Sequence, residues 1–118
     1  MRMWMIDPQL MCNKHLLGEH VETHMLAGSM KKGRSMAGFI TGKLVDLSKI
    51  GHRHDALASE ISERGMNHKS PLFQCSDWIG GSVDEFTSVI ELKSRCAECR
   101  DRIEEAELAI SSSIGIES

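Results

Sequence analysis

Residues 86–110 read FTSVIELKSRCAECRDRIEEAELAI, and this segment has the clearest periodicity in the chain. Apolar or small side chains recur there at steps of three or four residues: Phe86, Val89, Leu92, Cys96, Cys99, Ile103, Ala106 and Ile110. Charged residues fill the positions between them. This spacing is typical of one apolar stripe along an α-helix. We therefore predict one continuous helix here, with both cysteines buried as small core side chains.

A second helical pattern covers about residues 12–28, with Asn13 as a candidate N-cap. Leu17, Val21 and Met25 repeat every four residues, so we expect them to form the inward face of this helix. The stretch 31–43 contains three glycines, which favours a loop.

A further helix should include residues 54–64, with Leu57 and Ile61 turned inward and Gly65 directly after its end. The fold expected from these patterns is all-α: a compact single domain, residues 1–118, of three helices with long connecting loops. The N-terminal segment should pack against the first helix.

The 118 residues are enough for one domain with a modest core. No stretch is apolar enough to span a bilayer, and the first residues do not resemble a signal peptide. Four cysteines at irregular spacing predict reduced thiols. We expect a cytoplasmic monomer, in a bacterial cell or a phage-infected host, with no membrane partner.

The charge is unevenly distributed along the chain. The total is −3, but residues 1–70 carry a net +3 and all six histidines, whereas residues 71–118 carry −6. This asymmetry is expected if one face of the protein meets an anion and another faces water. A chance fluctuation in a short chain would give the same totals.

His15, Glu19 and Glu22 fall within a sector of about 60° on the first helix. Two carboxylates and an imidazole in line suit acid–base catalysis, although an ordinary solvated face has the same pattern. An α-amino group titrates near pH 7.7–8.0, so at neutral pH a useful fraction of it is a free nucleophile. The bulk of Arg2 should prevent removal of the initiator methionine, which leaves the amine of Met1 at the terminus.

Three blocks carry a family resemblance: RMWMIDPQLMCNKHLLGEHVETHML (2–26), RHDALASEISERGMNHKSPL (53–72) and RCAECRDRI (95–103). They resemble the phage-type pyrimidine dimer DNA glycosylases, the family of the T-even phage endonuclease V. The resemblance places Met1 at the position of the family's nucleophilic amine and Glu22 at that of its catalytic glutamate. It implies excision of cyclobutane pyrimidine dimers from double-stranded DNA, an imine intermediate and strand cleavage by β-elimination, with no cofactor or metal.

The resemblance also implies that Arg2, His15 and Glu19 position the sugar and phosphates. Further basic side chains should contact phosphates without reading sequence. The predicted DNA-binding residues are Arg2, His15, Glu19, Lys31, Lys32, Arg34, Arg53, Arg64, His68 and Lys69. The chain departs from the family's best-known member at Val21 and Met25, where that protein has arginines, and it lacks that protein's Tyr-rich tail.

These departures keep alternatives open. One alternative is that the enzyme is a glycosylase or AP lyase for another base lesion. A different class is a non-catalytic DNA-binding or zinc-stabilised module, because Cys12-x2-His15 and Cys96-x2-Cys99 together supply four zinc ligands. We favour the reading without metal, since a helical core explains the last two cysteines. The pair His20 and His24 lacks the glutamate of an H-E-x-x-H motif and is better read as helix-surface histidines.

Overall fold

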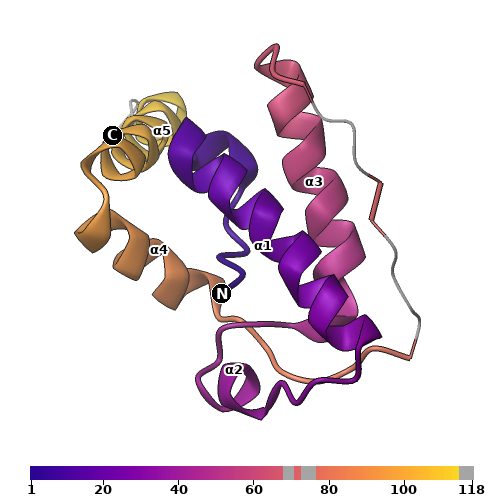
Figure 1. Ribbon diagram of the computed structural model, residues 1–118. Coiled ribbons are helices and arrows are strands. Elements are labelled where there is room, and N and C mark those ends of the chain that lie inside the picture. The colour runs from indigo at the N-terminus through magenta and orange to yellow at the C-terminus, as the bar shows by residue number, and fades with distance from the viewer. Residues whose placement is uncertain (68–70, 73–76, 115–118) are drawn as a thin grey trace.

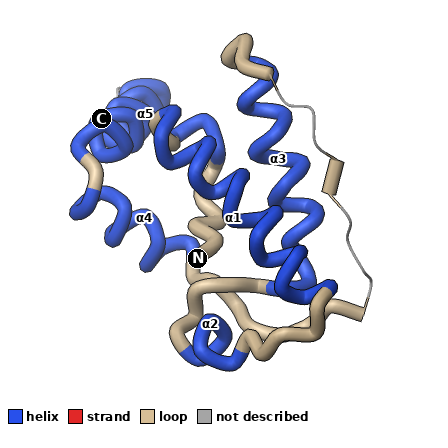
Figure 2. Tube along the Cα trace, in the orientation of Figure 1, coloured by secondary structure: helices blue, strands red, loops and turns tan. Residues whose placement is uncertain are grey.

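The computed structural model describes residues 1–67, 71–72 and 77–114, with side chains up to residue 110 in the last helix. Its five α-helices are α1 (Asn13–Lys31), α2 (Ala37–Thr41), α3 (Ile50–Glu63), α4 (Glu85–Arg95) and α5 (Ala97–Ile114). Two short 3-10 turns, Pro8–Leu10 and Leu47–Lys49, precede α1 and α3. The described residues contain no strand (Figure 2). The all-α class is confirmed, and the expected number of three helices is wrong.

The predicted continuous helix over residues 86–110 is two helices. Cys96 has extended backbone angles, φ −135° and ψ 115°, and separates α4 from α5, which pack against each other (Figure 1). A straight helix over this segment would be about 37 Å long and would overrun a small core. The break instead brings Leu92 and Cys99 into one core, while Phe86 and Ile110, at the two ends of the stripe, stay exposed.

The inward face of α1 is not the one that the apolar pattern predicted. Leu16 and Leu26 are buried, but so is Glu19, and the expected inward residues are exposed, Val21 at 54% and Met25 at 52%. Leu17, the third member of that stripe, is also exposed. The helix therefore buries the side that carries its acid–base residues and presents apolar side chains to the solvent.

The second predicted helix is confirmed as α3. Leu57 and Ile61 are buried, and Gly65 follows the end of the helix with φ +80°, a conformation that glycine adopts without strain. α3 packs along α1 (Figure 1). The stretch 31–43 is not entirely loop, because it contains α2, and the N-cap of α1 is Cys12 rather than Asn13.

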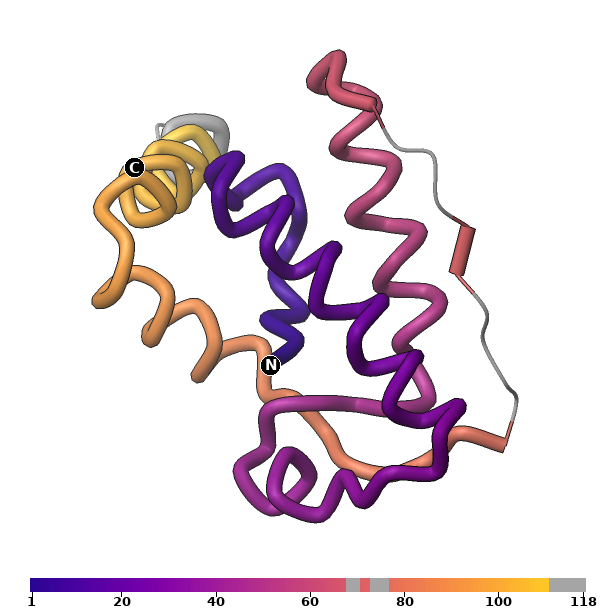
Figure 3. Tube along the Cα trace, viewed as in Figure 1, coloured from indigo at the N-terminus to yellow at the C-terminus, as the bar shows by residue number. Residues whose placement is uncertain are grey.

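The N-terminal segment runs through the middle of the molecule, between α1 and α4 (Figure 3). The Met3 backbone N–H donates to the Leu44 carbonyl oxygen at 2.7 Å. Met3 is buried in one hydrophobic cluster, whereas Trp4 and Ile6 are buried in another. The expectation that this segment packs against the first helix is confirmed, and its contacts with both cores fix where the chain terminus lies.

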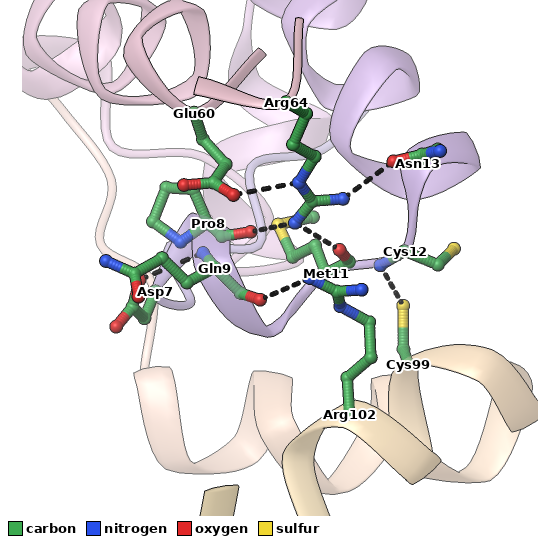
Figure 4. A network of polar contacts seen from close by, with 10 residues as sticks. All are labelled: Asp7, Pro8, Gln9, Met11, Cys12, Asn13, Glu60, Arg64, Cys99 and Arg102. Carbon is green, nitrogen blue, oxygen red and sulfur yellow. Dashed lines mark hydrogen bonds and ion pairs between the residues drawn. The ribbon is translucent and has the colours of Figure 1, made fainter. Parts of the chain in front are cut away.

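Arg64 holds the turn before α1 against the end of α3 (Figure 4). Its guanidinium donates to Glu60 Oε2 at 2.8 Å and Asn13 Oδ1 at 2.8 Å, and to the carbonyl oxygens of Pro8 and Met11 at 3.1 and 2.7 Å. Its side chain is only 14% exposed. Four acceptors around one guanidinium give Arg64 a role in the fold, where the sequence predicted a DNA contact.

Candidate active site

Glu22 meets the N-terminal segment near the middle of α1. The backbone N–H of Arg2 donates to Glu22 Oε2 at 3.3 Å, so the carboxylate holds the chain one residue from its terminus. Met1 lies at the rim of an open depression of about 300 Å³. The residues that line it are Met1, Met25, Gly28, Ser29, Lys32 and Arg34. The terminal residue, a carboxylate and two basic side chains therefore gather beside the second half of α1.

The side chain of Arg2 is held by the protein itself. Its Nη1 lies 2.9 Å from Glu91 Oε2 in α4, and its guanidinium lies 3.7 Å above the centre of the Trp4 ring. The hydrogen bond from Arg2 lowers the pKa of the Glu91 carboxyl, and the charges of Arg2 and Arg95 lower it further. The side chain is 13% exposed, so in the DNA-free protein Arg2 fixes the N-terminal segment between α1 and α4.

Glu19 and Arg53 form an ion pair inside the protein. Arg53 donates from Nε to Glu19 Oε2 at 2.6 Å and from Nη2 to Oε1 at 2.8 Å, and its Nη1 donates to the Ile6 carbonyl oxygen at 2.6 Å. The two side chains are 0% and 5% exposed. The expectation that they contact DNA is corrected, because neither presents a surface to a phosphate. The pair instead ties α1 and α3 to the N-terminal segment.

Three of the predicted DNA-binding residues are exposed together. Lys31, Lys32 and Arg34 lie at the end of α1 and just after it, and Lys32 and Arg34 line the depression beside Met1. His68 and Lys69 fall outside the described residues. The apolar side chains of Val21 and Met25 are exposed on α1 as well.

His15 faces sulfur atoms rather than the solvent. Burial lowers the pKa of its imidazole and nearby Lys14 lowers it further, while Glu22 acts in the opposite direction. Its ring contacts Trp4 edge-on, with 6.1 Å between centroids. A neutral imidazole is a poor partner for a phosphate and a good hydrogen-bond acceptor or metal ligand.

His15 belongs to a group that we call the thiol–imidazole cluster, whose members are Cys12, His15, Cys96 and Cys99. Burial raises the pKa of the Cys99 thiol to about 12. Burial also disfavours ionisation of Cys96, but hydrogen bonds, chiefly from the Cys99 backbone N–H, outweigh it and lower that pKa. The cluster lies at the start of α1, against the break between α4 and α5.

Sequence reasoning missed two residues that shape this site. Trp4 carries the guanidinium of Arg2 on its ring, and Glu91 binds that guanidinium from α4. Glu91 lies 89 positions from Arg2, and no local pattern marks it out from the other acidic residues of its helix. Trp4, by contrast, is one of two tryptophans in the chain and stands between Met3 and Met5, a composition that could have marked it as buried.

Comparison with known proteins agrees with this geometry. The family model described as pyrimidine dimer DNA glycosylase matches residues 1–74, which include the N-terminal segment, α1, α2 and α3. Neither the curated proteins nor the solved structures that were searched contain a match. Within the described residues, no helix is both long and apolar enough to cross a membrane. Since the match covers more than half of the chain and holds both Met1 and Glu22, this protein belongs to the pyrimidine dimer DNA glycosylase family, whose substrate is DNA and whose work is DNA repair.

Proposed function

We propose that the protein excises cyclobutane pyrimidine dimers from double-stranded DNA and then cuts the strand as an AP lyase. The α-amine of Met1 is the nucleophile, and Glu22 is its acid–base partner. The observation that carries the proposal is the 3.3 Å contact between the Arg2 backbone N–H and Glu22, which holds the terminal residue beside a carboxylate. The protein works as a monomer, and the chemistry at the amine uses no cofactor.

The reaction begins when the lone pair of the Met1 amine attacks C1′ of the damaged nucleotide. The glycosidic bond breaks, its electron pair leaves with the base, and the base takes up a proton. The nitrogen loses a proton, the C1′–O4′ bond opens with O4′ taking up a proton, and a protonated imine then joins Met1 to C1′. Glu22 supports these proton transfers, and its negative charge stabilises the positive charge of the protonated imine.

Strand cleavage follows from the imine. Glu22 accepts a proton from C2′, the electrons form a C2′–C3′ double bond, and the C3′–O bond breaks with the phosphate as leaving group. Water then hydrolyses the imine and frees the amine. A protonated imine makes the C2′ proton far more acidic, so a single carboxylate is a sufficient base for this step.

The DNA-binding face is the exposed side of α1 and the residues just after it. Lys31, Lys32 and Arg34 supply phosphate contacts that do not depend on sequence. Exposed Val21 and Met25 offer apolar contacts to a base or sugar that has been turned out of the helix. The depression beside Met1 is the place where such a nucleotide meets the amine.

The test is a strand-nicking assay on three duplexes that differ only in a thymine dimer, an abasic site or an undamaged thymine pair. Glu22→Gln should slow cleavage of the dimer duplex by roughly 10²–10⁴-fold. Glu63→Gln, an exposed change of the same chemistry in α3, should not. Dimer cleavage by Glu22→Gln at the rate of the Glu63→Gln control would refute the mechanism. Cleavage of the abasic duplex alone would refute the dimer specificity and favour an AP lyase.

A further inference from the structure

The thiol–imidazole cluster brings four metal-ligating side chains from two distant segments of the chain to one point. One donor atom from each of the four lies within 4.8 Å of all the others. Cys12 is the N-cap of α1 and His15 lies in its first turn. Cys96 lies at the break between α4 and α5, and Cys99 lies in the first turn of α5. Residues 84 or more positions apart therefore meet here.

Three of the six distances between donor atoms in the cluster are close to the edges of a zinc-centred tetrahedron. With Zn–S bonds of about 2.3 Å and Zn–N bonds of about 2.0–2.1 Å, tetrahedral geometry requires S···S edges of about 3.8 Å and S···N edges of about 3.5 Å. Cys12 Sγ lies 3.8 Å from Cys96 Sγ and 3.3 Å from His15 Nδ1, and Cys99 Sγ lies 3.7 Å from His15 Nδ1.

Backbone N–H groups point at two of the sulfurs, as expected around thiolates bound to a metal. The Cys12 N–H donates to Cys99 Sγ at 3.2 Å (Figure 4), and the Cys99 N–H donates to Cys96 Sγ at 3.4 Å. Such contacts would stabilise the negative charge that a sulfur carries once it has bonded to a metal. Core packing accounts for the break at Cys96, but it does not require the ligating atoms of four residues to meet at one point.

We propose that the thiol–imidazole cluster binds one structural zinc ion. The three thiols each release a proton when their sulfurs bond to the metal, and neutral His15 supplies the fourth ligand through Nδ1. All four positions of the tetrahedron are filled by protein, so the ion has no open position for a substrate or a water. It is a cross-link and takes no part in the chemistry of the N-terminal amine.

The cross-link joins the family-matched part of the chain to the part outside that match. Cys12 and His15 lie within residues 1–74, while Cys96 and Cys99 lie beyond them. A metal clip compensates for a small core in a chain of this size. His15 also contacts Trp4, on whose ring Arg2 lies, so the ion supports the segment that carries Met1. His15 is thereby assigned to the metal in place of the phosphate contact expected from the resemblance.

Zinc content of the untagged protein, measured by elemental analysis, tests the proposal directly. We expect one zinc per chain, lost in Cys99→Ser and retained in His24→Gln. His24 belongs to a separate group of three imidazoles with His20 and His54, whose ring centroids are 4.8–5.0 Å apart. His24→Gln therefore tests whether the zinc is bound by these histidines instead of the thiol–imidazole cluster. Full zinc content in Cys99→Ser, or its loss only in His24→Gln, would overturn the assignment.

A second measurement needs no variant and so does not depend on how Cys99→Ser folds. The wild-type protein is stripped of metal under reducing conditions and titrated with Co²⁺. A tetrahedral site with three thiolates gives strong visible bands and sulfur-to-cobalt charge-transfer absorption that saturate at one equivalent, and added Zn²⁺ abolishes them. The absence of these bands, or a metal-free protein with a disulfide between two cluster cysteines, would refute the zinc site whatever the enzyme's activity.

Discussion

The substitution Glu19→Gln separates a role in the fold from a role in DNA binding. Glu19 and Arg53 are joined by two hydrogen bonds of 2.6 and 2.8 Å and are 0% and 5% exposed. Neutralising the carboxylate leaves the guanidinium buried without its counter-charge, and breaking one side of a buried pair costs about 3–5 kcal/mol. At about 4 °C per kcal/mol for a domain of this size, the melting temperature should fall by about 12–20 °C.

The loss should be much smaller when both charges are removed. In the double variant Glu19→Met/Arg53→Met no charge remains buried, and such replacements are often close to neutral. The Ile6 carbonyl oxygen then loses its donor from Arg53, which costs about 1–3 kcal/mol. We therefore expect the double variant to be more stable than Glu19→Gln, because the single variant alone leaves a buried charge without its partner.

Urea unfolding followed by circular dichroism measures these free energies, with exposed Glu63→Gln as the control, expected within about 0.5 kcal/mol of wild type. The affinity of Glu19→Gln for undamaged duplex is measured below its melting temperature and without urea, so that the variant is folded. The reasoning would be refuted if Glu19→Gln lost less than about 1 kcal/mol of stability and instead changed the salt dependence of DNA binding, because that pattern belongs to a residue at the DNA interface.

Three further predictions concern charge. The pKa of Glu91 is lowered by Arg2, so the contribution of the ionised carboxylate to stability is present at neutral pH and is lost as pH falls through the lowered folded-state pKa. Acidification should therefore destabilise wild type more than Glu91→Gln in urea unfolding, and equal losses would contradict the pairing of Arg2 with Glu91. Lys32→Ala should lower the slope of log affinity against log salt by about 0.9, while Arg100→Ala on α5 should leave it unchanged. Val21→Arg, at a position 54% exposed, should raise that slope by a similar amount without a change in stability, and unchanged binding would place this face of α1 away from DNA.

The part of the site that the sequence predicted is the part set by local spacing and family resemblance. Glu22 lies beside the N-terminal segment because it is on α1, and α3 with its terminal Gly65 followed from periodicity and turn chemistry. The exposed face of α1 could not be read in this way. Glu19 is buried only because Arg53, 34 positions later, is buried with it, and no pattern within one helix reports a partner on another.

The break at Cys96 has a similar explanation. Periodicity alone predicts a helix for as long as the apolar stripe continues, and the stripe continues through Cys96 and Cys99. The extended backbone at Cys96 lies where Cys96 contacts Cys12 and Cys99 contacts His15, two residues at the far end of the chain. The position at which α4 ends and α5 begins thus goes with long-range contacts among sulfur and imidazole side chains, which the local hydrophobic pattern does not report.

Borohydride trapping tests most directly whether the Met1 amine is the nucleophile. The untagged protein is mixed with a labelled duplex that holds one thymine dimer, with abasic and undamaged duplexes as controls. Borohydride reduces the imine and fixes the enzyme to C1′ of the sugar. We expect a covalent complex on the dimer duplex, attached at the Met1 amine as identified by peptide mass. Attachment at a lysine, or no complex on any duplex, would contradict the account.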